Sequence, residues 1–146
     1  MYEKINTQLK NNFLAAAQKE ITHKQLEKTL KIDGEVELSD INWPLYDALS
    51  KFEPFGVGNP EPVFLTCQVK VEDFRLVGNE GKHLKLAISY QPLAISFEAI
   101  GFGLGEWGQK LKIGDQIDLV YTILVDSWNG QERLQLKIRD LRPSLP

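Results

Sequence analysis

The chain has 146 residues, with 17 lysines and arginines against 20 aspartates and glutamates, one cysteine and 42% hydrophobic residues. These values describe a globular protein of about one domain and exclude an internal disulfide framework, and no apolar run approaches the roughly 20 residues of a membrane-spanning helix. The single cysteine and the absence of a secretory signal favour a reducing, cytoplasmic location, and the net charge of −3 confines any contact with a polyanion to a local basic patch.

The first fifty residues carry a helical pattern. Apolar residues at helical spacing predict a first helix over residues 5–19, and Thr22 is a candidate N-cap of a second, short helix. Val36 and Leu38 alternate with Glu35 and Glu37, which predicts a brief strand over residues 35–38. A third helix is predicted to start at residue 39 or 42 and to end at residue 52.

From residue 64 onward the hydrophobic pattern has the period of two that is typical of β-strands. Asn129-Gly130 predicts a tight hairpin, and a short helix is expected in the Gly-rich stretch after the third strand. Five strands with a brief helix after the third is the order of an OB-type barrel. We therefore expect an α+β chain, with an N-terminal helical segment followed by a five-stranded antiparallel OB-type β-barrel. The predicted strands begin at residues 64, 83, 95, 117 and 133 and end at residues 71, 90, 99, 125 and 141.

An eleven-residue segment separates the two patterns. Residues 52–62 contain three prolines and two glycines. Because proline fixes its own φ and restricts the residue before it, this segment is predicted to be stiff.

Groups that could support catalysis or bind a metal are scarce. His23 and His83 have no acidic cluster beside them, so each is interpreted as a surface or structural residue. Cys67 is placed on the core side of its strand, with Leu65, and a buried thiol is a poor nucleophile. The glycine motifs at 56–58 and 101–105 lack the strand, turn and helix order of a phosphate cradle. No catalytic residue and no metal ligand is predicted.

A basic face is expected on the last strand, where cations alternate with apolar residues. Cations that follow phosphates and an exposed aromatic ring that stacks a base are the ingredients of sequence-tolerant single-strand binding. The alternative is that these cations are only the solvated sides of strands, diluted by Glu72, Glu98, Asp118 and Glu132. Phe102 and Trp107 are left open between core and surface. The candidate nucleic-acid-binding residues are Lys70, Arg75, Lys82, Lys85, Trp128, Arg133, Lys137 and Arg139.

The motifs of the chain resemble a known family. They are Phe-Glu-Pro-Phe-Gly-Val-Gly-Asn-Pro-Glu-Pro-Val-Phe at residues 52–64, Arg-Leu-Val-Gly at 75–78 and Lys-His-Leu-Lys-Leu at 82–86. Together they are similar to the C-terminal part of the RecJ family of bacterial single-stranded-DNA-specific exonucleases, over essentially the whole chain. The resemblance implies that residues 1–52 are the helical tail of a DHHA1-like subdomain, residues 53–62 a rigid linker and residues 63–146 an OB-fold domain.

The resemblance also implies that the catalytic parts lie elsewhere. The DHH subdomain, which binds two divalent metals (Mn or Mg), and the Gly-Gly-His motif of DHHA1 would lie upstream, and neither motif occurs in this sequence. We therefore expect a C-terminal fragment without a cofactor or enzymatic activity of its own. Its parent would hydrolyse single-stranded DNA from the 5′ end in repair and recombination.

Two functions follow as hypotheses. In the first, the chain holds single-stranded DNA for the missing catalytic DHH and DHHA1 domains, and a single-strand-binding protein is a further expected partner. In the second, it is a structural or protein-interaction module that packs on the catalytic domains or recruits a partner, with little DNA contact. No membrane partner is expected.

Overall fold

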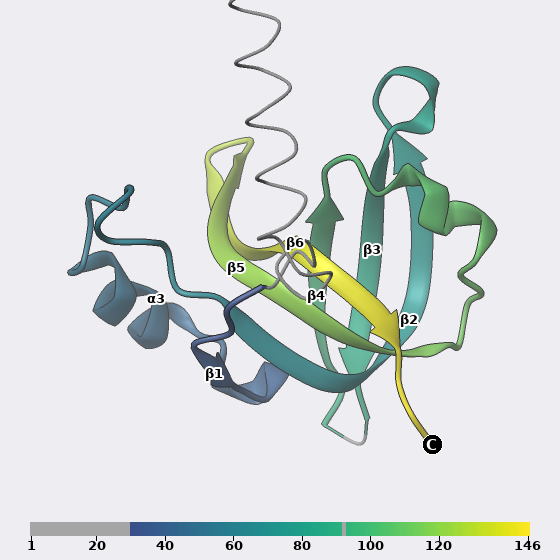
Figure 1. The fold of residues 1–146 in the computed structure, drawn as a ribbon, viewed down its shortest axis with the longest axis horizontal. Helices are drawn as coiled ribbons and strands as arrows, with labels where there is room; N and C mark the ends of the chain where they lie inside the picture. The colour runs from purple at the N-terminus through teal and green to yellow at the C-terminus, as the bar shows by residue number, and fades with distance from the viewer. Residues whose placement is uncertain (1–29, 92) are drawn as a thin grey trace, which may run out of the picture. The chain divides into compact units, whose positions relative to one another are not determined.

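The computed structural model describes residues 30–146 with the exception of residue 92. The chain divides into two compact units, Met1–Lys31 and Ile32–Pro146, and every element described belongs to the second (Figure 1). The helices predicted over residues 5–19 and after Thr22 lie outside the described residues. Among the helices that the structure does describe, none is long and apolar enough to cross a bilayer.

Five long strands close into a barrel, as predicted (Figure 1). Their hydrogen-bonded order is β2-β3-β4-β6-β5, and β5 pairs again with β2. Most pairings of the barrel are antiparallel, but β4 and β6 run parallel, so the antiparallel prediction was wrong for this pair of strands. The reason is that β5 lies between them in sequence but not in the sheet, so β6 returns in the direction of β4. The strands are β2 (Phe64–Val77), β3 (His83–Tyr90), β4 (Ile95–Gly101), β5 (Gln116–Trp128) and β6 (Gln131–Pro143).

The segment before the barrel contains three short elements. The strand β1 (Gly34–Glu35) pairs in parallel with the start of β2. The strand predicted over residues 35–38 overlaps β1 only at Glu35, and its last residue belongs to the 3-10 helix η1 (Leu38–Asp40). The helix α3 (Trp43–Ser50) begins as predicted, because the Asn42 side chain caps it by accepting from the Leu45 amide at 2.9 Å. It ends two residues earlier than expected.

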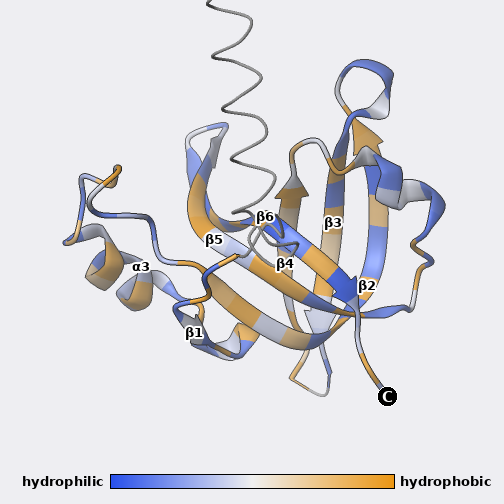
Figure 2. Ribbon diagram, in the orientation of Figure 1, coloured by the Kyte–Doolittle hydropathy of each residue, from blue (hydrophilic) through white to orange (hydrophobic). Residues whose placement is uncertain are grey.

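The hydrophobic core fills the barrel, and Leu38 of η1 and Ile41 belong to it. Hydrophobic and hydrophilic residues alternate along much of the long strands (Figure 2). Tyr121 is fully buried and shares a 2.7 Å hydrogen bond with the Thr66 hydroxyl, and burial raises the pKa of Tyr121 to about 12. The assignment of residues 1–52 to a DHHA1-like subdomain stays a prediction, as does the separate linker.

A bulge in β2 corrects one sequence interpretation. Gln68 has a φ of 59°, and the register of β2 against β5 shifts between Thr66 and Val69. Thr66 is therefore buried ahead of the bulge, whereas Cys67, which was predicted to face the core, is only half-buried. Simple alternation fails here because one extra residue reverses the faces of all residues before it. Burial still raises the pKa of the Cys67 thiol, helped by the charges of Asp118 and Glu35.

The connections of the barrel match their sequence signals. The 3-10 helix η3 (Gly105–Gln109) lies between β4 and β5, where a short helix was expected. Asn129 and Gly130 have φ angles of 51° and 74°, the conformation of a tight two-residue hairpin turn. A further short 3-10 turn, η2 (Asn79–Gly81), joins β2 to β3.

Candidate nucleic-acid interface

A row of cations crosses the outer face of the barrel. The strand register pairs Arg75 of β2 with Lys85 of β3, Lys85 with Ile100 of β4, and Ile100 with Lys137 of β6. Directly paired residues point to the same face, so Arg75, Lys85 and Lys137 form one transverse line, the cationic row. With neighbouring strands about 4.8 Å apart, the row spans about 14 Å.

An exposed aromatic ring lies beside the row. Phe102, directly after β4, is 55% exposed, and the Lys137 ammonium lies 5.9 Å from its ring centroid. His83 contacts Phe102 edge to face at 5.3 Å, and its Nδ1 accepts a hydrogen bond from the Gly103 amide at 2.9 Å. Phe102 is thus held in place with part of its surface open to a ligand.

The structure separates Phe102 from Trp107, two residues that the sequence left open. Trp107 is partly buried and packs against the core, with the Lys110 ammonium 5.0 Å from its ring centroid. Phe102 is a surface residue. The sequence around Phe102 and Trp107 could not show which of the two is buried, because this depends on how η3, which contains Trp107, packs on the barrel.

Glu98 of β4 lies between two of the predicted cations. Its Oε2 is 3.4 Å from the Lys85 ammonium and 3.2 Å from Nη2 of Arg133. Arg133 also contacts Asp126 of β5 through Nε, at 3.2 Å. Arg133 is therefore linked to the cationic row through Glu98, and two carboxylates contact its guanidinium group. Within the described part of the chain, Arg75 and Lys137 take part in no ion pair.

Two hollows lie on this face. One of about 630 Å³ extends from the start of α3 to β4 and β6, and one of about 250 Å³ is lined by Arg75 and Lys85. Ala87 and Glu98 line both hollows.

The other predicted residues lie away from the row. Lys70 is about 16 Å along β2 from Arg75 and pairs with Glu72 at 3.3 Å. Lys82 follows the turn between β2 and β3, Trp128 is 70% exposed at the β5–β6 hairpin, and Arg139 is exposed beyond Lys137 on β6. Sequence alternation identified the outward cations but could not show which of them share a row.

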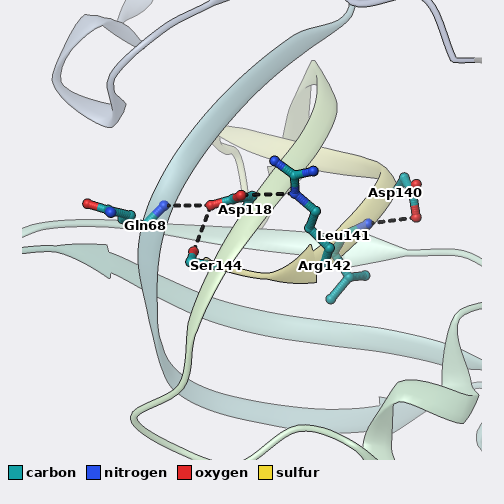
Figure 3. A network of polar contacts seen from close by, with 6 residues as sticks. All are labelled: Gln68, Asp118, Asp140, Leu141, Arg142 and Ser144. Carbon is teal, nitrogen blue, oxygen red and sulfur yellow. Dashed lines mark hydrogen bonds and ion pairs between the residues drawn. The ribbon is translucent and has the colours of Figure 1, made fainter. Parts of the chain in front are cut away.

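The carboxylate of Asp118 belongs to the framework of the barrel rather than to its charged face (Figure 3). It is 5% exposed and accepts hydrogen bonds from the Gln68 amide at 3.1 Å, the Ser144 hydroxyl at 2.7 Å and the Arg142 Nε at 3.0 Å. Burial alone would raise the pKa of Asp118, but these hydrogen bonds outweigh it and hold the pKa below its ordinary value. Asp118 thereby ties the β2 bulge to β5 and to the end of β6.

The described residues do not suit a divalent metal centre. Among them, no group of three or more His, Cys, Asp or Glu side chains could hold a metal ion. The His83 Nδ1 is already taken by the Gly103 amide, and the carboxylates of Glu98 and Asp118 face cations.

Comparison with known proteins points to one family. A family model described as the RecJ OB domain matches residues 32–140. The crystal structure of RecJ in complex with Mn²⁺ from Thermus thermophilus is similar, with a TM-score of 0.51 and 26% sequence identity, over 70% of this chain and 14% of that one.

Two curated relatives share the name single-stranded-DNA-specific exonuclease RecJ. The protein from Bacillus subtilis is 25% identical over 132 residues, which cover 90% of this chain and 16% of the relative. The protein from Thermus thermophilus is 29% identical over 99 residues, or 67% of this chain and 13% of the relative. The chain thus spans only 13–16% of the length of these two relatives.

Proposed function

The chain belongs to the RecJ OB domain family, and from this we propose that it is the single-stranded-DNA-binding module of a RecJ-type 5′-to-3′ exonuclease acting in repair and recombination. The module itself is non-catalytic. The parent's Mn²⁺ or Mg²⁺ ions are held by residues outside this chain. Its partners are single-stranded DNA and the catalytic DHH and DHHA1 domains, with a single-strand-binding protein as a further partner in the cytoplasm.

The cationic row beside Phe102 carries this proposal. Phosphates of an extended strand meet Arg75, Lys85 and Lys137 in turn, and a base stacks on the open ring of Phe102. This pairing of cations with an aromatic platform is sequence-tolerant, because every base has a π-face. It also suits a single strand better than a duplex, whose bases are already stacked on one another.

The modest charge of the row fits a tethered module. The chain carries a net charge of −3, so the isolated domain attracts DNA weakly. A module linked to a catalytic core acts at a high effective concentration and needs little affinity of its own. Weak intrinsic binding also leaves the strand free to move along the surface.

Two double variants test the proposal. Arg75→Gln with Lys137→Gln removes two cations that make no ion pair with another described residue. Lys51→Gln with Lys112→Gln changes the net charge equally at two exposed residues outside the row. We expect the first variant to bind a fluorescent oligothymidylate at least several-fold more weakly than wild type in an anisotropy titration, and the second to bind nearly as well.

Equal affinities of the two double variants would overturn the assignment of the row as the binding site. If wild type itself bound no single-stranded DNA at low salt and high protein concentration, the structural or interaction hypothesis would replace DNA binding. Circular dichroism spectra of all variants are the check that the barrel stays intact.

A further inference from the structure

Glu98 has an unusual position on the proposed DNA-binding face. It projects from β4 between Lys85 of β3 and Arg133 of β6, so its single carboxylate bridges cations from both neighbouring strands. The Oε2 atom is shielded from solvent and makes no hydrogen bond within the described part of the chain, although the side chain as a whole is 36% exposed. Its contacts with the two cations are therefore ion pairs, and a phosphate, which also carries negative charge, could pair with the same two cations.

The bridge also lies where the two hollows of this face meet. Arg133 lines the larger hollow, Lys85 lines the smaller one, and Glu98 and Ala87 line both. Because alanine has the smallest side chain after glycine, Ala87 places only a methyl group between the two hollows. A strand that runs from one hollow to the other must pass the Lys85, Glu98 and Arg133 ion pairs.

We propose that Glu98 is an internal counter-ion, which occupies the place of a phosphate between Lys85 and Arg133 and is displaced when a strand binds. This inference rests on the proposed function, and it identifies Glu98 as the residue that limits the affinity of the chain for single-stranded DNA. Displacement is feasible because the pairs are only partly buried, and such ion pairs are weak. The Oε2 atom is covered, but the side chains of Lys85, Glu98 and Arg133 are 22%, 36% and 52% exposed.

Internal competition also favours polymers over small anions. A lone phosphate must compete with a carboxylate that is attached to the protein and therefore always present. Successive phosphates of a strand are tethered to one another in the same way, so once one phosphate binds, the next meets Lys85 at a high effective concentration. Glu98 thus suppresses binding of mononucleotides and inorganic phosphate more than binding of single-stranded DNA.

The test compares Glu98→Gln with Glu132→Gln in the full 146-residue chain. Both substitutions are nearly isosteric and remove one negative charge, and both residues line the larger hollow. Of these two residues, only Glu98 forms an ion pair with a cation of the described part of the chain. We expect Glu98→Gln to bind oligothymidylate about two- to thirtyfold more tightly than wild type, as expected from the release of two weak ion pairs. Glu132→Gln is expected to gain less than twofold.

A double-mutant cycle shows whether the gain comes through Lys85. Lys85→Gln should cost more affinity in the Glu98→Gln background than in wild type, because the ammonium is fully available to DNA only when Glu98 is neutral. A second substitution, Glu98→Asp, keeps the charge but shortens the side chain, so it cannot bridge both cations. We expect its affinity to lie between those of wild type and Glu98→Gln.

The outcomes separate the two proposals. Equal affinities of Glu98→Gln and Glu132→Gln, with wild type binding DNA, would overturn the role of Glu98 and leave the binding function standing. Loss of affinity in Glu98→Gln with an unchanged thermal midpoint would overturn it as well, because Glu98 would then support the bound state. Absence of binding by wild type and by every variant would overturn the proposed function and, with it, this inference.

Discussion

Single residues on the outer face decide whether the barrel can hold a strand. Phe102 is the clearest case, because its ring is fixed by His83 on one edge and approached by the Lys137 ammonium, yet more than half of it is exposed. A buried ring such as Trp107 could stabilise the fold but could not meet a base. A fixed and exposed ring can stack without first being ordered, so it loses little entropy on binding.

Replacing Phe102 by alanine is expected to weaken binding of oligothymidylate by about 5- to 150-fold, since stacking contributes about 1–3 kcal/mol per base. Phe52 is a matched control, because it is 66% exposed but lies outside the barrel, just after α3. Phe52→Ala should bind like wild type in the same anisotropy titration. Similar losses in both variants would count against Phe102 as a stacking platform.

The sequence predicted the chemistry of this face better than its geometry. Alternation along one strand shows that Lys137 points outward, and the same is true of Lys85 on its own strand. Their common row depends on the registers of β3 with β4 and of β4 with β6, which are long-range pairings. The exposure of Phe102 was likewise unpredictable, because an aromatic residue in a glycine-rich turn can face either way.

At the scale of elements, the β2 bulge determines which residues at the start of β2 face the core, and the carboxylate of Asp118 stabilises this bulge. A bulge leaves a backbone amide without a hydrogen-bond acceptor on the neighbouring strand. In β2 this amide belongs to Gln68, and it donates to the carboxylate of Asp118 instead. The same carboxylate reaches the last residues of the sheet through Arg142 and Ser144 (Figure 3). Strand number and the Asn129-Gly130 hairpin were predictable from local signals, whereas this bulge has no local signal and is stabilised by a residue fifty positions away.

Asp118→Asn is expected to destabilise the barrel by about 1–3 kcal/mol at pH 7, because a buried charge-assisted network loses its charge. The folded-state pKa of Asp118 lies below its ordinary value of 3.8, so the contribution of the carboxylate is fully present above that pH. It is lost as the pH falls through the lower folded-state pKa. Urea denaturation of both proteins should therefore show a stability difference at pH 7 that shrinks below pH 3.8.

Asp140→Asn is the control for this measurement, since Asp140 is exposed and accepts from the neighbouring Leu141 amide (Figure 3). It should change the free energy of unfolding by no more than about 0.5 kcal/mol. A stability difference between wild type and Asp118→Asn that stayed constant from pH 7 to pH 3 would show that the ionised carboxylate is not the stabilising species.

For the whole molecule, the global charge and the local surface lead to different expectations. A chain with a net charge of −3 should not attract DNA, yet its barrel places Arg75, Lys85 and Lys137 in one row. Two of the acidic residues that the sequence placed among these cations do not repel DNA as free surface charges would. Asp118 is buried in the framework, and Glu98 is paired with Lys85 and Arg133. Binding is therefore predicted to be local, weak and sensitive to salt.

The central claim is that this face binds single strands through their phosphates and bases. The most direct measurement is the affinity of the 146-residue chain for a single-stranded oligonucleotide and for the matching duplex, titrated over a range of salt concentrations. We predict tighter binding of the single strand at every salt concentration, and a logarithmic salt slope near −2, since the three cations of the row contribute about 0.7 each. Equal affinity for the duplex, or affinity that does not change with salt, would contradict the claim.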